Sequence, residues 1–136
     1  PLIARWPGKV KAGHVSDQIQ AFWDFLPTFA DLVSQPVPRT LDGPSVLSAW
    51  LENRALLHPP LYWEFHEADY LRAVRMGNWK GVSTDRSKPL ELYDLAADPA
   101  EKENVVDGHP FVVRQIEDIM KKEHVPDPRW PDIPGR

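Results

Sequence analysis

The sequence predicts an α+β fold in which a small four-stranded antiparallel sheet packs against a C-terminal helix. Beyond residue 60, apolar side chains recur at alternate positions in four short runs, a pattern typical of strands with one buried face. The connections between these runs are too short for crossover helices, which favours antiparallel pairing. A strongly amphipathic stretch over 110–125 then supplies the helix that would cover one face of the sheet.

The first part of the chain carries a different pattern, which predicts a strand followed by helices. Residues 2–6 are mostly apolar and are followed by a Pro-Gly pair, which predicts a short, mostly buried strand. A helix is expected to begin at Asp24, a favourable N-cap, with Pro27 in its first turn. Its apolar residues share one face at helical spacing: Phe25, Leu26, Phe29, Leu32 and Val33. A second short helix is expected near 46–51, before a proline-containing linker.

The four strands are expected over runs bounded by turn residues. They lie at 61–65, 70–76, 79–82 and 90–95. Gly77 and Asn78 join the second and third runs, and both residue types tolerate the positive φ that such reversals require. In the last helix, Pro110 suits the first turn. The sequence therefore predicts a meander covered by one helix, with the main boundary of the chain near 57–60.

Composition argues against several classes of function. The chain has 136 residues, a net charge of −4 and no basic stripe of the kind that binds nucleic acid. It contains no cysteine, which excludes disulfides, cysteine-based zinc sites and cysteine nucleophiles. No run approaches the roughly 18 apolar residues of a membrane helix. No signal peptide is visible, but the chain opens without an initiator methionine and resembles a cut end, so its compartment stays open.

One cluster of acidic residues and a histidine stands out at 64–69. Strand alternation places Glu64 and His66 on one face, and it predicts Trp63 and Phe65 on the other, against the core under the last helix. A carboxylate beside an imidazole can bind a sugar hydroxyl, transfer a proton or hold a metal ion. Motifs such as GxSxG, HExxH and a phosphate-binding glycine loop are absent.

A purely structural interpretation of this cluster is equally physical. Glu64 can pair across strands with Arg72 or Arg75, and His66 can be a solvated hairpin residue. Exposed charge is common at the ends of hairpins, so spacing alone favours this interpretation.

Six blocks follow one another along nearly the whole chain: PLIARWPGKVKAG, VSDQIQAFWDFLPTFADL, LDGPSVL, LYWEFHE, AVRMGNWKGV and LELYDLAADPAEKENV. In this order and spacing, the chain resembles the C-terminal portion of an arylsulfatase-type sulfatase of the alkaline phosphatase superfamily. The resemblance runs from Pro1 to about Lys122, and RWPGK, DFLPT and LYDLAADPAEKENV are its most specific parts.

The resemblance implies a parent enzyme that hydrolyses sulfate esters of sugars or aryl alcohols, using a formylglycine and a calcium ion. The formylglycine arises from a Cys or Ser in a C/S-x-P-x-R motif, and this chain contains neither that motif nor an Asp-Asp pair for calcium. No catalytic or metal-binding residue is therefore assigned here. Both cofactors are expected in a preceding domain, and the chain alone is expected to be inactive.

The resemblance also implies an arrangement of domains. Residues 1–57 resemble the end of the sulfatase α/β catalytic domain, and 58–136 resemble its smaller C-terminal subdomain of sheet, helix and extended tail. The loop after the first strand of this subdomain is expected to reach the substrate pocket, which makes His66, and then Glu64 and Glu67, candidate substrate contacts. The resemblance favours a periplasmic or secreted protein, and truncation would expose a surface through which two copies can associate.

Two alternatives stay open at this point. The first is a phosphodiesterase or phosphonate monoester hydrolase of the same superfamily, because such enzymes share the C-terminal motifs. The second is a stand-alone carbohydrate-binding or assembly module that uses the exposed face of the sheet. An upstream C/S-x-P-x-R motif would favour the sulfatase, whereas tight binding of sulfated glycans by this chain alone would favour the module.

Overall fold

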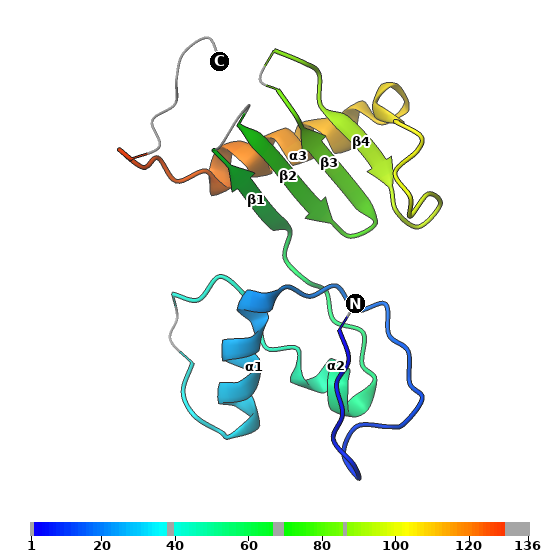
Figure 1. Ribbon diagram of the computed structural model, residues 1–136, viewed down its shortest axis with the longest axis vertical. Coiled ribbons are helices and arrows are strands. Elements are labelled where there is room, and N and C mark those ends of the chain that lie inside the picture. Colours follow the sequence, from blue (N-terminus) through cyan, green and yellow to red (C-terminus); the bar gives the residue numbers. More distant parts are fainter. Residues whose placement is uncertain (1, 38–39, 67–69, 86, 130–136) are drawn as a thin grey trace. The chain divides into compact units, whose positions relative to one another are not determined.

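The computed structural model describes residues 2–37, 40–66, 70–85 and 87–129 (Figure 1). The chain divides into two compact units, Pro1–Pro59 and Pro60–Arg136, which we call the N-terminal and the C-terminal unit. Within the described ranges, no helix has the length and apolar character needed to cross a membrane.

The C-terminal unit is an α+β fold built on an antiparallel meander, as the sequence predicts. Its strands are β1 (Leu61–Phe65), β2 (Leu71–Met76), β3 (Trp79–Ser83) and β4 (Glu91–Asp94). They pair in sequence order, and a 3-10 turn, η2 (Val106–Gly108), leads into the helix α3 (Pro110–Glu123). Figure 1 shows α3 running across one face of this sheet. The prediction of a four-stranded sheet with a C-terminal helix is therefore confirmed.

The core of the C-terminal unit lies between α3 and the sheet. Its buried residues are Val74, Leu90, Leu92, Ile116 and Met120. Gly81 of β3 lies directly under the helix, because a Cβ atom at this position would be only 2.6 Å from Cγ2 of Ile116. The absence of a side chain at Gly81 thus allows α3 to approach the sheet closely.

The two faces of β1 are the reverse of those predicted. Tyr62 packs against the core under α3, and Glu64 contacts His124 at the C-terminal end of that helix. Trp63 and Phe65, predicted to lie on the core face, are instead 41% and 52% exposed. The alternation was predicted correctly, but the face was chosen by hydrophobicity alone. That choice was wrong because hydroxyl and imidazole groups on the helix side satisfy the carboxylate of Glu64.

The N-terminal unit contains a 3-10 turn, η1 (Phe22–Asp24), and two helices, α1 (Phe25–Leu32) and α2 (Leu47–Glu52). The strand predicted over 2–6 is not formed, and Ile3 in this segment is 90% exposed. A segment becomes a strand only when a neighbouring strand pairs with its backbone, and the described residues of this unit supply no such neighbour.

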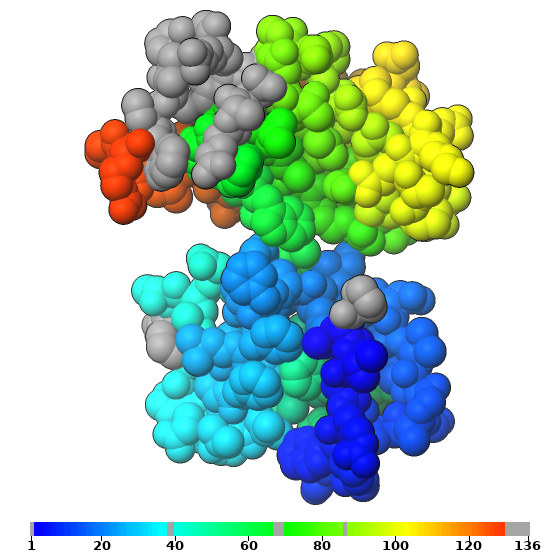
Figure 2. All heavy atoms as spheres, in the orientation of Figure 1, coloured from blue at the N-terminus to red at the C-terminus, as the bar shows by residue number. Residues whose placement is uncertain are grey.

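Helix α1 buries polar side chains and exposes apolar ones, the opposite of a typical surface helix. Its N-cap Asp24 and its Thr28 are buried, whereas Leu26 and Phe29 are 60% and 50% exposed. The hydroxyl of Thr28 accepts a hydrogen bond from the backbone N–H of Val46 at 2.9 Å, which ties α1 to the start of α2. Figure 2 shows α1, in light blue, as part of the surface of the N-terminal unit. Much of the predicted apolar stripe is therefore exposed.

A buried hydrogen-bonded pair, Asp24 and His58, joins the start of α1 to the linker that follows α2. The two side chains are 1% and 3% exposed, and Nε2 of His58 lies 3.0 Å from Oδ2 of Asp24. The same Oδ2 accepts a bond from the N–H of Ala21 at 2.6 Å, and Nδ1 of His58 lies 2.7 Å from the carbonyl oxygen of Pro59. Gly43 packs so closely that any side chain there would collide with Oδ1 of Asp24. Because both ring nitrogens are occupied, we interpret this pair as structural.

Candidate functional site

The candidate site lies at the edge of the sheet, where β1 ends. Glu64 belongs to β1, His66 follows the strand, Tyr70 precedes β2, and His124 is the C-cap of α3. Antiparallel pairing of β1 with β2 and packing of α3 on β1 bring these four residues together. The third candidate from the sequence, Glu67, lies outside the described residues.

The carboxylate of Glu64 is the centre of a hydrogen-bonded cluster. Its Oε1 lies 3.1 Å from Nε2 of His66, and its Oε2 lies 2.8 Å from Nδ1 of His124. Oε2 also accepts hydrogen bonds from the hydroxyls of Tyr62 and Tyr70, the latter at 3.3 Å. We call these five residues the Glu64 cluster. The structure thus places Glu64 and His66 together, within a larger network than the sequence suggested.

The ring of Tyr70 packs among the other members of the cluster. Its centroid lies 4.9 Å from that of His66 and 6.2 Å from that of His124. Tyr70 has a φ of +56°, a left-handed conformation that costs a bulky residue about 1–2 kcal/mol. Its hydroxyl donates to Glu64 and lies 3.0 Å from Nδ1 of His124, and these contacts and those of its ring oppose this strain, which indicates that the position of the side chain is strongly determined.

Electrostatics keep Glu64 ionised. Burial alone raises the pKa of this carboxyl group, but hydrogen bonds from Tyr62, His124 and His66 outweigh burial and lower the pKa to about 2. Burial, and then the hydrogen bond to Glu64, raises the pKa of Tyr62, so its hydroxyl stays protonated. A carboxylate with so low a pKa is a poor general acid or base at neutral pH. The cluster therefore fixes a negative charge and surrounds it with donors.

The arginines considered as partners of Glu64 make other contacts. Arg72 lies opposite Glu64 in the strand register, but its guanidinium carbon lies 5.3 Å from the centre of the Tyr70 ring. The Nε atom of Arg72 is buried without a hydrogen-bond partner in the described part of the chain. Arg75 donates its Nε–H to a backbone carbonyl in the β2–β3 turn, at 2.7 Å. Neither arginine takes the central place that the histidines and tyrosines occupy.

His124 is the member of the site that the sequence did not reveal. A histidine at the end of a helix is typically a partner for the helix dipole or an exposed residue, so the sequence gives no reason to place His124 in a site. It follows Glu64 by 60 residues, so no local spacing links the two. The available signal was the length of the helix, because a helix of 14 residues is long enough to cross the sheet from β4 back to β1.

The low pKa of Glu64 predicts how the stability of the C-terminal unit depends on pH. The folded pKa of about 2 lies below the ordinary value of 4.5, so the contribution to stability is complete above about pH 4.5. It is expected to decline as the pH falls from 4.5 towards 2. The Glu64 side chain is still 17% exposed, so solvent screens part of its interactions. We therefore expect a loss of about 1–2 kcal/mol in the free energy of unfolding.

Urea denaturation at several pH values, followed by circular dichroism, would measure this loss. The matched comparison is Glu64→Gln, which removes the titrating group, so the difference in stability between the two proteins should shrink below pH 4.5. A difference that stays constant from pH 6 to about pH 2 would contradict the assignment.

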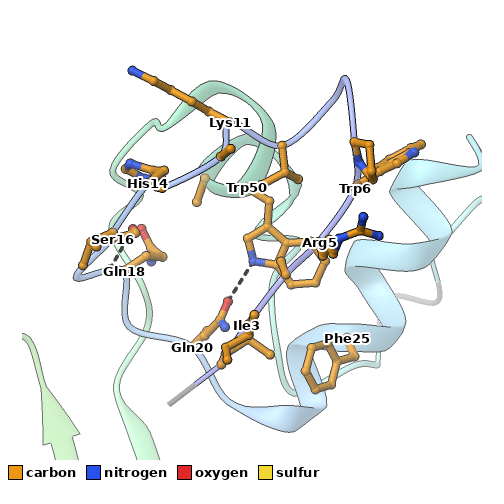
Figure 3. Close-up of a pocket in the computed structure, with 18 of the residues that line it drawn as sticks. Ile3, Arg5, Trp6, Lys11, His14, Ser16, Gln18, Gln20, Phe25 and Trp50 are labelled. Atoms are coloured by element: carbon orange, nitrogen blue, oxygen red, sulfur yellow. Dashed lines mark hydrogen bonds between the residues drawn. The ribbon is translucent and has the colours of Figure 1, made fainter.

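A groove of about 1120 Å³ opens in the N-terminal unit, lined by most of the residues between 2 and 22 together with Phe25, Ala49 and Trp50. The indole N–H of Trp50 donates to Oε1 of Gln20 at 3.1 Å across this groove (Figure 3). No group of three or more His, Asp or Glu side chains in the described ranges is placed to hold a metal ion.

Several known proteins similar to this chain are named as sulfatases. A family model described as N-sulphoglucosamine sulphohydrolase, C-terminal, matches residues 1–125. An N-acetylglucosamine-6-O-sulfatase of Bacteroides thetaiotaomicron is 32% identical, over 86% of this chain and 23% of the relative. An N-acetylgalactosamine-6-O-sulfatase of the same organism is 29% identical, over 89% of this chain and 26% of the relative. The chain thus spans about a quarter of the length of these relatives.

Solved structures share the fold. The crystal structure of Ps i-CgsB superimposes with a TM-score of 0.77 and 27% identity, over 86% of this chain and 27% of that protein. The same protein has been solved in complex with k-i-k-neocarrahexaose. The structure of BT4656 in complex with its substrate D-glucosamine-2-N,6-O-disulfate gives a TM-score of 0.70 at 23% identity, over 87% of this chain and 26% of that one, and it supports the fold alone. Since the family model covers nearly the whole chain, the protein belongs to the N-sulphoglucosamine sulphohydrolase C-terminal family of sulfatase domains.

Proposed function

We propose that this chain acts as the C-terminal part of a sulfatase that hydrolyses sulfate esters of sugars. The observation that carries the proposal is the family match over residues 1–125, together with relatives that are themselves named sulfatases. These relatives are about four times as long as the stretch they share with this chain, so most of such an enzyme would lie outside it. The comparisons favour a sulfatase over the phosphodiesterase and phosphonate hydrolase alternatives.

The chemical step is expected to belong to the preceding part of the enzyme. A formylglycine would supply the nucleophile there, and a calcium ion would offset negative charge on the sulfate. This chain contains no cysteine and no S-x-P-x-R motif, so it does not fit the formylglycine. Its described residues include no group of three or more His, Asp or Glu side chains placed to hold a metal ion, so they do not fit the calcium ion either. We therefore derive no catalytic step from this chain and assign it to positioning and substrate contact.

Residues 58–136 are proposed to be the subdomain that flanks the cleft, and His66 is proposed as its substrate contact. His66 stands immediately after β1, at a sheet edge, and its side chain is 18% exposed. An imidazole held at such a position can hydrogen-bond a sugar hydroxyl or a sulfate oxygen. Glu64 and Glu67 remain secondary candidates, and Glu64 is already engaged by the donors of its cluster.

Residues 1–57 are proposed to be the end of the catalytic domain, which would cover the exposed stripe of α1. Leu26, Phe29 and Val33 are each at least half exposed. Exposed apolar groups on one helix face are typical of a surface that another structure covers. In the isolated chain, a second copy is expected to cover this stripe, and a monomer at all concentrations in light scattering would contradict that expectation.

A hybrid enzyme tests the proposal. This chain would replace the matching quarter of the N-acetylglucosamine-6-O-sulfatase of Bacteroides thetaiotaomicron, to which it is 32% identical. We expect the hybrid to hydrolyse a sulfated sugar and a small aryl sulfate. His66→Ala should raise KM for the sugar about tenfold, the equivalent of one hydrogen bond, and leave KM for the aryl sulfate nearly unchanged.

His109→Ala is the matched control, because this imidazole lies at the opposite end of α3 and should not affect KM. A folded hybrid that hydrolyses neither substrate would contradict the sulfatase assignment, and an unchanged KM in His66→Ala would remove His66 from the substrate site. The chain alone should hydrolyse no aryl sulfate, with or without calcium. Tight binding of sulfated glycans by the chain alone would instead favour a stand-alone module.

A further inference from the structure

We propose that Glu64 is a positioning residue that holds the imidazole of His66 in its Nε2–H tautomer, with His124 completing the arrangement from the end of α3. This inference rests on the proposed function, in which His66 contacts the substrate. It concerns a state of the ring that can be measured without any catalytic assay.

The positions of the protons follow from the contacts of the carboxylate. Oε1 of Glu64 lies 3.1 Å from Nε2 of His66, and Oε2 lies 2.8 Å from Nδ1 of His124. An ionised carboxylate can only accept hydrogen bonds, so each facing nitrogen must carry a proton. The low pKa of Glu64 supports the ionised form. The neutral ring of His66 therefore carries its lone pair on Nδ1, and that of His124 carries its own on Nε2.

The carboxylate is itself held in place by groups from the strand and the loop. The hydroxyls of Tyr62 and Tyr70 both donate to Oε2, and the ring of Tyr70 packs against that of His66 with centroids 4.9 Å apart. The side chains of Glu64 and His66 are 17% and 18% exposed, so little room is left for the imidazole to turn over. Positioning of this kind is common for imidazoles, because the bond made by one ring nitrogen determines the chemistry of the other.

The tautomer decides which ligand groups His66 can recognise. While neutral, the ring accepts through Nδ1, which fits a sugar hydroxyl. When protonated, it donates through the same Nδ1, which fits a sulfate oxygen. Without the carboxylate, Glu64 no longer fixes the proton of the neutral ring on Nε2, and a ligand must then select the tautomer at an entropic cost. Glu64 would therefore strengthen substrate contact without touching the substrate.

Nitrogen-15 NMR of the imidazole rings in the 136-residue chain tests this proposal. Once the pH has been raised until the spectrum shows both rings to be neutral, it distinguishes the protonated nitrogen of each ring from the unprotonated one. We expect His66 to carry its proton on Nε2 and His124 on Nδ1. In Glu64→Gln, the amide presents a donor to one of the two rings, so the ring that faces it should change its tautomer.

Glu91→Gln is the matched control. Glu91 also accepts a tyrosine hydroxyl on this sheet, from Tyr93 at 2.8 Å, but it lies on β4. This substitution should leave both tautomers unchanged. His66 protonated on Nδ1 in the wild-type chain would overturn the proposal, and this measurement needs no variant to fold. Unchanged tautomers in a folded Glu64→Gln protein would also overturn it. Neither outcome depends on the KM values of the hybrid enzyme, so the two proposals can fail separately.

Discussion

Replacing Asp24 with alanine is expected to lower the free energy of unfolding of the N-terminal unit by about 3–5 kcal/mol. The substitution leaves His58, which is 3% exposed, with its Nε2 buried and unpaired, and it removes the acceptor of the Ala21 N–H. A region of about 60 residues seldom has a larger stability margin than this. We therefore expect Asp24→Ala to unfold most of the N-terminal unit and to leave the C-terminal unit folded.

Hydrogen exchange read by mass spectrometry separates the two units and measures this effect. Asp31→Ala is the matched control, because this carboxylate on α1 accepts the Ser45 hydroxyl at 2.6 Å in an exposed position. Its loss should cost less than about 1 kcal/mol. Asp24→Ala combined with His58→Ala should cost clearly less than the sum of the two single changes, since they remove one shared interaction. Equal effects of Asp24→Ala and Asp31→Ala would show that the buried pair contributes little.

The second large effect is expected where α3 meets β3. Gly81→Ala places a methyl group 2.6 Å from Cγ2 and 3.1 Å from Cδ1 of Ile116, and overpacking of this kind costs about 1–3 kcal/mol. Ile116 is fully buried, so Ile116→Ala leaves a cavity that costs about 2–5 kcal/mol. In the double variant, the new methyl group enters the space that the isoleucine has left. We expect the double variant to be more stable than the sum of the single losses predicts, by about 1 kcal/mol or more.

Urea denaturation of the wild type, the two single variants and the double variant measures this coupling. Gly108→Ala is the control, because a Cβ atom at that position meets nothing within 4 Å. It should change the stability of the C-terminal unit by less than about 0.5 kcal/mol. Losses that simply add would show that the helix and the sheet can shift apart, and that the close approach at Gly81 is not a strict requirement.

The sheet of the C-terminal unit could be predicted because its signals are local. A period of two, a Gly-Asn reversal and an amphipathic last helix each depend on residues close in sequence, and the structure contains all three features. The prediction of a strand over 2–6 was wrong for a related reason. Its apolar run was local too, but a strand also needs a pairing partner, which the run itself cannot indicate.

The candidate site could be predicted only in part. Glu64 and His66 are two residues apart on an alternating strand, so their common face followed from the sequence. Whether this common face points towards α3 or away from it could not be predicted. One of the donors that satisfy Glu64 is His124, which lies 60 residues further along the chain. Hydrophobicity placed Trp63 in the core, whereas the structure leaves it 41% exposed. A polar group can take a helix-covered face when tertiary partners replace its water, and such partners are invisible to a local pattern.

The separation between Glu64 and His124 also bears on synthesis. Translation adds about 5–20 residues per second, so the 60 residues between them take about 3–12 s to appear. A hairpin such as β1–β2 can form within microseconds of its synthesis. For several seconds the nascent chain would therefore carry this hairpin with a carboxylate that still lacks one of its imidazole partners. Completion of the last helix would end that interval, so the translation rate sets the earliest moment at which the cluster can close.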